Sequence, residues 1–192
     1  KGKCAFRIEP SPSGTLHIGH AYGIGVNYSY AKMYDGKFFV RIADTNPDNI
    51  YPLAYELIPR DANWLTENGI TEVVVQSDRL GLYYDAAEKL ISQGNAYVCT
   101  CSSDEFRTLI NNKKACSCRG LPVKNHLERW AKMFGEFKPG EAVVRIKTDV
   151  EHPNPAMRDW PAMRINDHVH PRQGTKHRVW PLMNLSVAVD DH

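Results

Sequence analysis

Hydrophobic and polar residues alternate at the start of the chain and then recur with helical spacing. In residues 4–9 (Cys-Ala-Phe-Arg-Ile-Glu) apolar and polar side chains alternate, which predicts a half-buried β-strand. The Pro/Ser/Gly-rich residues 10–14 break this pattern, and residues 17–34 can then form a helix. After a short Asp-Gly turn, the apolar run of residues 37–43 predicts a second strand.

Strands and helices go on alternating beyond this point. Three further segments follow in the order helix, strand, helix, at residues 52–67, 73–75 and 83–93. Strands that alternate with helices indicate βαβ units and a parallel sheet. Because such a sheet binds ligands at the carboxyl ends of its strands, we expect the functional site in the loops at residues 10–14 and 44–47.

The pattern changes after Val98. Four cysteines, two helical stretches and two β-like segments predict an inserted α+β unit; the helices are expected at residues 104–113 and 123–134, and the β-like segments at 142–148 and 162–166. The predicted fold class is therefore α/β: the first half of a Rossmann-like parallel sheet with an inserted α+β unit. We expect residues 1–97 to form the first part, residues 98–178 the insertion, and residues 179–192 a return to the first domain.

Composition narrows the function classes only slightly. The 192 residues include 24 basic and 22 acidic side chains, so the net charge of +2 gives no nucleic-acid signal by itself. No stretch approaches the roughly 20 apolar residues that a membrane-spanning helix needs. A charged-then-apolar leader is also missing, so we expect a cytoplasmic protein without a membrane partner.

Residues 17–20, His-Ile-Gly-His, lie at the start of the helix that follows the first predicted strand. A helix N-terminus offers unpaired N–H groups and partial positive charge, which makes it a ready anion site. His17 and His20 are three residues apart and project from one side of the first turn, so both could donate hydrogen bonds to phosphate oxygens. The alternative interpretation is a loop with two surface histidines.

Cysteines occur in two close pairs within the predicted insertion. Cys99 and Cys101 form one pair and Cys116 and Cys118 the other, a donor set that fits a tetrahedral structural Zn²⁺ site. The expected compartment keeps thiols reduced, which argues against disulfides. The alternative is four ordinary small hydrophobic residues.

Four ordered segments of the chain carry a family resemblance, at residues 7–21, 41–47, 143–160 and 170–192. The first resembles the N-terminal signature of the class I aminoacyl-tRNA synthetases, in the form used by the glutamyl and glutaminyl enzymes. Together the four resemble the archaeal-type glutamyl-tRNA synthetase more than the glutaminyl enzyme. The resemblance covers the N-terminal part of the catalytic region, and the family's Lys-Met-Ser-Lys-Ser-type loop and anticodon-binding domain fall outside it.

This resemblance implies a role for each residue of the first signature. Gly14, His17, Gly19 and His20 would bind ATP, with the two glycines admitting adenine and ribose and the two histidines acting on the phosphates during catalysis. The amino acid would be bound by four residues, namely Arg7, Glu9, Ser11 and Ala43. A planar guanidinium such as that of Arg7 can hold a carboxylate through two parallel hydrogen bonds.

Position 43 departs from the family pattern. The family's acidic residue, which holds the α-ammonium group of the substrate, falls on Ala43. Asp44 is adjacent, but neighbouring side chains on a strand point to opposite faces, so we expect that Asp44 does not replace the missing acid. The sequence leaves open whether Ala43 is compensated by another residue or reflects an altered pocket.

For the whole enzyme, the resemblance implies activation of glutamate with ATP and Mg²⁺ and transfer of the glutamyl group to the 3′ end of tRNA-Glu. Whether tRNA-Gln is also an acceptor stays open. The insertion would approach the acceptor end of tRNA, with a basic bias supplied by Lys113, Lys114, Arg119, Lys124, Arg129, Lys132 and Lys138. The resemblance also supports the Zn²⁺ site, because some glutamyl-tRNA synthetases bind zinc in this insertion.

Two other interpretations are kept beside this one. The chain could be a catalytically silent fragment that binds tRNA or another partner, since half of the ATP site would be missing from it. Less favoured is another nucleotidyltransferase with a His-x-Gly-His turn, such as a cytidylyltransferase or pantothenate synthetase. Those enzymes lack the Asp-Thr-Asn-Pro loop at residues 44–47 and the paired cysteines.

Overall fold

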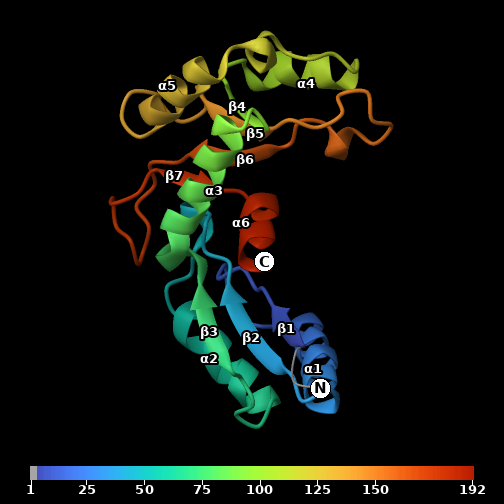
Figure 1. Ribbon diagram of the computed structural model, residues 1–192. Helices are drawn as coiled ribbons and strands as arrows, with labels where there is room; N and C mark the ends of the chain where they lie inside the picture. The colour runs from blue at the N-terminus through green and yellow to red at the C-terminus, as the bar shows by residue number, and fades with distance from the viewer. Residues whose placement is uncertain (1–3) are drawn as a thin grey trace. The chain divides into compact units, whose positions relative to one another are not determined.

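The computed structural model describes residues 4–192, and these form two β-sheets (Figure 1). The first sheet is parallel with strand order β1-β2-β3, from β1 (Ala5–Ile8), β2 (Lys37–Ile42) and β3 (Glu72–Val75). The second is antiparallel with order β4-β5-β6-β7, from β4 (Ala96–Cys99), β5 (Val143–Ile146), β6 (Pro161–Ile165) and β7 (Val179–Pro181). The predicted α/β class with an inserted α+β unit is confirmed.

Contacts divide the chain into two compact units. One comprises the residues up to 79 together with 169–174, and the other comprises residues 80–168 and 175–192. Helix α3 (Leu80–Ser92) and strand β7 belong to the second unit, because Ala87 and Val179 lie in its apolar core. This division by contacts differs from the sequence-based boundaries at residues 97 and 178, and the three-part arrangement in the whole enzyme stays a prediction.

The first unit is built on one face of the parallel sheet. Successive side chains of a strand point to opposite faces, so every second residue of β2 faces the helices; these are Phe38, Val40 and Ile42, each at most 1% exposed. Helices α1 (Ile18–Met33) and α2 (Ala54–Leu65) complete this core with Ile24, Ala31, Ala54, Ile58 and Ala62. The opposite face of the sheet carries Arg7 on β1, with Phe39 and Arg41 on β2.

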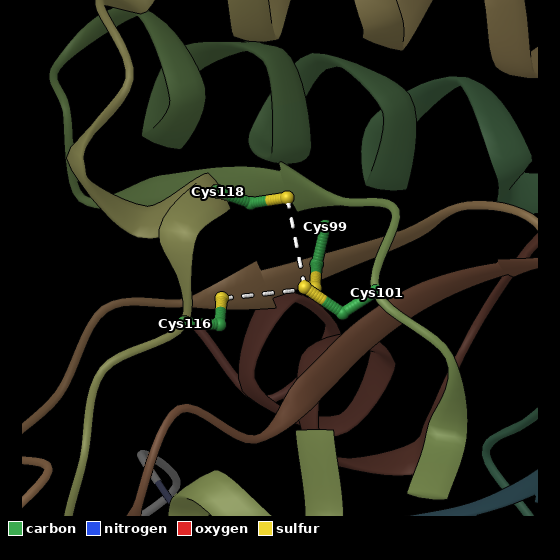
Figure 2. Close-up of side chains that lie close together, drawn as sticks. All are labelled: Cys99, Cys101, Cys116 and Cys118. Carbon is green, nitrogen blue, oxygen red and sulfur yellow. Dashed lines mark hydrogen bonds between the residues drawn. The ribbon is translucent and has the colours of Figure 1, made fainter. Parts of the chain in front are cut away.

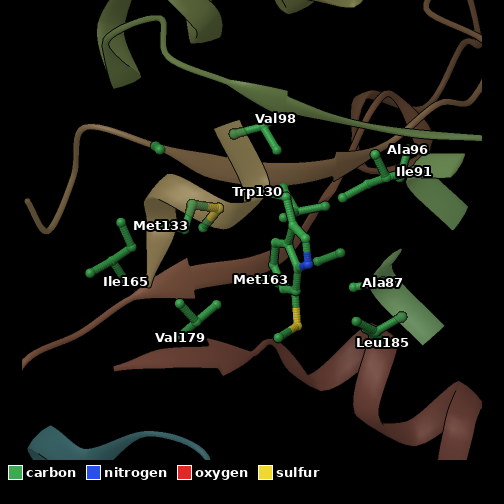
Figure 3. Close-up of a cluster of buried hydrophobic side chains, with 13 residues drawn as sticks. Ala87, Ile91, Ala96, Val98, Trp130, Met133, Met163, Ile165, Val179 and Leu185 are labelled. Carbon is green, nitrogen blue, oxygen red and sulfur yellow. The ribbon is translucent and has the colours of Figure 1, made fainter. Parts of the chain in front are cut away.

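The second unit has an apolar core between the antiparallel sheet and the helices α3, α5 (Val123–Met133) and α6 (Met183–Asp190). Trp130 and Met133 of α5 lie at its centre with Met163 of β6, as Figure 3 shows. Strand β4 is buried on both faces. Ala96 and Val98 join this core, whereas Tyr97 and Cys99 join a second cluster with α4 (Ser103–Asn111).

Short 3₁₀ helices follow or link several of these elements, at η1 (Pro47–Asn49), η2 (Gln76–Arg79), η3 (Ser117–Gly120) and η4 (Pro155–Met157). The helices predicted from residues 17–34, 52–67, 83–93, 104–113 and 123–134 correspond to α1 through α5 within three residues at each end. Strands β4 and β7 and helix α6 were not predicted. Across the described residues, every helix is too short or too polar to cross a bilayer.

Gly69 allows the turn after α2 to pass against the ring of Tyr28. A Cβ atom at position 69 would lie 2.0 Å from Tyr28 Oη and 2.3 Å from its Cζ, closer than any real contact. Tyr28 packs on Phe38 with ring centroids 5.8 Å apart, so moving its ring disturbs the core of the first unit. Glycine at position 69, just after the predicted helix of residues 52–67, is therefore a packing requirement.

We predict that Gly69→Ala lowers the free energy of unfolding by about 1–3 kcal/mol, the usual cost of overpacking. Gly25→Ala is the matched control, because Gly25 lies inside α1 with open space at its Cβ position. That change is expected to raise stability by about 0.5–1 kcal/mol through helix propensity. Urea unfolding followed by circular dichroism measures both; equal effects of the two substitutions would contradict the packing argument.

Candidate functional site

The two histidines of the signature cap the N-terminus of α1 reciprocally. His17 is the N-cap residue with extended backbone, and its Nδ1 accepts a hydrogen bond from the Gly19 N–H at 3.1 Å. The Nδ1 of His20 accepts from the N–H of His17 at 3.2 Å. The ring centroids of the two imidazoles are 3.9 Å apart. Two N–H groups that the sequence analysis expected to be unpaired are thus satisfied by the imidazoles themselves.

This capping determines the tautomer of both rings. Because each Nδ1 accepts a hydrogen bond, the proton of each neutral imidazole is assigned to Nε2, which is then a donor. Burial lowers the pKa of His20, and the neighbouring His17 lowers it further, so His20 is neutral at pH 7. The helix terminus therefore presents two Nε2–H donors, which suit hydrogen bonding to an anion.

The two signature glycines have different roles in the structure. At Gly19, a Cβ atom would lie 3.0 Å from Cε1 and 3.1 Å from Nδ1 of the His17 ring, so the glycine makes room for the capping imidazole. At Gly14 a Cβ atom would meet nothing within 4 Å. The close approach of a nucleotide that the resemblance implies at these positions stays a prediction.

A charged cluster lies at the carboxyl end of the parallel sheet, on the face opposite the helices. The Glu9 Oε2 atom is 2.7 Å from Arg41 Nη2 and 3.1 Å from Arg7 Nη1. The other carboxylate oxygen of Glu9 accepts a hydrogen bond from Gln76 Nε2 at 3.1 Å. Exposed fractions of the side chains are 32% for Arg7, 11% for Glu9 and 4% for Arg41. Two guanidinium groups thus share one carboxylate, which leaves the cluster with a formal charge of +1.

Of the four residues predicted to bind the amino acid, the structure brings Arg7 and Glu9 into contact. Ala43 follows β2, and its N–H donates to the carbonyl of Pro10, which extends the pairing of β1 with β2. Ser11 lies exposed in the loop after β1. Arg41 and Gln76 were missed by sequence reasoning, although the alternation along residues 37–43 places Arg41 and Ala43 on one face.

Asp44 is buried and takes no part in the charged cluster. Its carboxylate accepts hydrogen bonds from Tyr55 Oη at 2.7 Å and from the Ser77 N–H and hydroxyl at 2.8 and 2.7 Å. His170 Nε2 lies 2.9 Å from the carbonyl oxygen of Asp44. Burial, together with the Asp44 charge, raises the pKa of Tyr55 far above its usual value. The Asp44 carboxylate is thus engaged by Tyr55 and Ser77, and the expectation that Asp44 does not stand in for an acid at position 43 stays a prediction.

The four paired cysteines converge between the end of β4 and the η3 turn, as Figure 2 shows. Cys99 Sγ lies 3.8 Å from Cys116 Sγ, and Cys101 Sγ lies 3.8 Å from Cys118 Sγ. All four sulfur atoms lie within 4.8 Å of one another. These separations are far longer than a disulfide bond, and all four thiols are free.

The surroundings of the sulfurs favour thiolates at both cysteines of the second pair, Cys116 and Cys118. The hydrogen bond with Cys99, together with backbone N–H donors, lowers the pKa of Cys116 to about 5. Burial acts to raise the pKa of Cys118, but hydrogen bonds from Thr100 and Arg129 outweigh it and lower the value. Arg129 Nη1 lies 3.3 Å from Cys118 Sγ. Burial raises the pKa of Cys101 to about 11.

This donor set fits a tetrahedral metal ion. Zinc–sulfur bonds of about 2.3 Å place the sulfurs of a regular tetrahedron about 3.8 Å apart. That edge equals both paired Sγ–Sγ distances in the structure. Four soft sulfur donors in such an arrangement select zinc over hard cations such as Mg²⁺.

Asp159 fixes the loops around the cysteines. Its carboxylate accepts hydrogen bonds from the hydroxyl of Tyr97 at 2.8 Å, from Arg119 Nε at 2.9 Å and from the N–H of Thr148 at 2.8 Å. Two of the basic residues predicted to approach tRNA are held by contacts inside the unit. Arg119 donates to Asp159, and Arg129 donates to the carbonyl of Val98 and to Cys118 Sγ. Lys113, Lys114, Lys124 and Lys138 are exposed.

Comparison with known proteins agrees with this geometry. Residues 3–192 match the family described as "tRNA synthetases class I (E and Q), catalytic domain". The sequence is 54% identical to the glutamate–tRNA ligase of Methanothermobacter thermautotrophicus over 194 residues, and 54% identical to that of Pyrococcus furiosus over 198 residues. Each match covers 100% of this chain and 34% of the relative, so the chain spans about a third of the length of these curated relatives.

Solved structures support the fold independently. A crystal structure of a glutamate tRNA ligase from Elizabethkingia meningosepticum, in complex with its amino acid, matches with a TM-score of 0.67. The identity is 20%, and the match covers 99% of this chain and 42% of that one. The motif resemblance, the sheet topology and the family match agree, and the chain belongs to the class I aminoacyl-tRNA synthetases of the glutamyl and glutaminyl group, within their catalytic domain.

Proposed function

We propose that the full-length protein carrying this chain is a glutamate–tRNA ligase that activates glutamate with ATP, releases pyrophosphate and transfers the glutamyl group to the 3′ end of tRNA-Glu. The observation that carries the proposal is the pair of imidazoles at the start of α1, with both Nδ1 atoms occupied by backbone N–H groups. The archaeal relatives named glutamate–tRNA ligases support the choice of amino acid and tRNA.

In the first step, the formation of glutamyl-adenylate, each part of the proposed site in the first unit has a separate role. The carboxylate of glutamate attacks the α-phosphorus of ATP, and the bond to pyrophosphate breaks. The imidazole donors stabilise the phosphate charge that develops, and Arg7 positions the amino acid beside them. ATP is expected to bind as its Mg²⁺ complex, with the ion held chiefly by phosphate oxygens. Catalysis of this kind is positional and electrostatic.

The second unit is proposed to hold the acceptor end of tRNA and to depend on a structural zinc ion. Cys99, Cys101, Cys116 and Cys118 would hold that ion, which would fix the end of β4 to the η3 turn. Exposed lysines of this unit would attract the phosphates of tRNA without reading its sequence. A cytoplasmic location is proposed with this role in charging tRNA. Whether tRNA-Gln is also charged depends on parts of the enzyme beyond this chain.

A silent binding fragment is the competing interpretation, and one assay separates the two. Glutamate-dependent exchange of pyrophosphate into ATP by the full-length protein supports the ligase. Retention of tRNA without any exchange would support the binding fragment instead. The nucleotidyltransferase interpretation has lost its basis, because the family match covers residues 3–192.

We predict that His20→Asn lowers kcat for ATP–pyrophosphate exchange by about 10²–10³, the usual loss when one oxyanion donor is removed. The asparagine oxygen can still accept the hydrogen bond from the His17 N–H, so the helix stays capped. The matched variant His20→Gln keeps a donor near the Nε2 position and should lose distinctly less activity. Equal losses in the two variants, at unchanged melting temperature, would contradict the donor role.

A second prediction concerns the metal. The purified protein should contain one Zn²⁺ per chain by plasma mass spectrometry, and chelation should lower its melting temperature, because metal binding contributes folding free energy. Cys101→Ser should reduce the zinc content well below that ratio. Cys4→Ser is the control, since Cys4 is exposed and distant in sequence from the four ligands. Unchanged zinc content in Cys101→Ser would contradict the assignment of the ligands.

A further inference from the structure

Glu9 forms, with Arg7, a charge pattern that complements an amino acid. An α-amino acid carries a carboxylate and an ammonium group on the same carbon atom. In the structure a guanidinium and a carboxylate lie in contact, with Arg7 Nη1 and Glu9 Oε2 3.1 Å apart. A zwitterion whose carboxylate binds Arg7 therefore brings its ammonium group to the carboxylate of Glu9.

Sheet geometry places Glu9 on the side of the sheet from which Arg7 reaches a ligand. Arg7 and Glu9 are two residues apart on β1 and its extension, so both face away from the helices. Arg41 and Ala43 share the same face on the neighbouring strand, because Val40 and Ile42, which alternate with them along the chain, are buried in the core. Ala43 carries no charge, so on this face the carboxylate in contact with Arg7 comes from β1.

The charges also balance for one class of ligand. Arg7, Arg41 and Glu9 together carry +1, and an acidic amino acid with two carboxylates and one ammonium group carries −1 at neutral pH. Gln76 Nε2 and Arg41 Nη2 hold the two oxygens of Glu9 at 3.1 and 2.7 Å, which fixes the carboxylate in position before a ligand arrives. Such preorganisation reduces the cost of ordering on binding.

We propose that Glu9 binds the α-ammonium group of the amino acid substrate, as the carboxylate that position 43 does not supply. The inference rests on the proposed function, since it assumes that Arg7 receives the substrate's carboxylate. Glu9 thus determines specificity for an amino acid over a simple dicarboxylic acid, while Arg41 and Gln76 keep its side chain in place.

The test compares glutamate with glutarate, the same dicarboxylate without the ammonium group, on the full-length protein. Dissociation constants of both ligands are measured by calorimetry for the wild type and for Glu9→Gln. Loss of a charge-assisted hydrogen bond is worth about a 10- to 100-fold change in affinity. We expect Glu9→Gln to weaken glutamate by that factor while glutarate changes little, so that the preference for glutamate collapses.

Glu72→Gln is the matched control, because Glu72 is an exposed carboxylate of the same sheet that begins β3, two strands away from β1. It should leave the ratio of the two dissociation constants unchanged. Equal weakening of glutamate and glutarate by Glu9→Gln would show that Glu9 only holds the arginines in place, and would overturn the proposal. No change in either ligand would overturn it too.

A measurement on the wild type covers the case in which Glu9→Gln does not fold. A crystal structure with bound glutamate should place the ammonium nitrogen about 2.7–3.2 Å from a Glu9 carboxylate oxygen. An ammonium group bound elsewhere would overturn the proposal. Failure of the proposed function itself looks different, since the wild type would then show no glutamate-dependent exchange at all.

Discussion

Parallel pairing of β1 with β2 is the constraint on which the first unit depends. Its register sets Arg7 beside Phe39 and Ile8 beside Val40, so Ile8 and Val40 face α1 and α2 whereas Arg7 faces the other way. A shift of one residue would turn every side chain of a strand to the opposite face. The buried core and the charged cluster therefore specify the same register, and the site is fixed by the packing of the sheet.

The second unit depends less on apolar packing at one end, where the loops that carry the cysteines lie. Its antiparallel sheet has an extensive apolar core on one face, but the other face ends in the loops that carry the cysteines. These loops have little regular structure of their own. Three hydrogen bonds to Asp159 and the convergence of four sulfurs hold them together. A metal ion at the sulfurs would add a cross-link where apolar packing is thin.

The sequence predicted the periodic elements and the motif residues, but not the contacts among them. Helices α1 to α5 carry clear amphipathic spacing or breakers at their ends. Strand β4 has no visible alternation because Ala96, Tyr97, Val98 and Cys99 are all fully buried, and α6 is nearly apolar without a capping side chain. Arg41 and Gln76 could not be predicted as site residues, because neither belongs to a sequence motif. Their contacts with the Glu9 carboxylate form only in the folded sheet. The convergence of the cysteines was predictable because their paired spacing is itself a ligand pattern.

Because Gly19 makes room for the His17 ring, substitutions at these two positions should depend on each other. The backbone at position 19 is not in the left-handed region, and the glycine is needed because the imidazole folds over it. In descendants of this protein that lose His17, position 19 should become free to accept alanine or serine. In those that keep the imidazole, glycine should persist even where nucleotide binding has been abandoned. The two residues should therefore be inherited as a unit, with the histidine changing first.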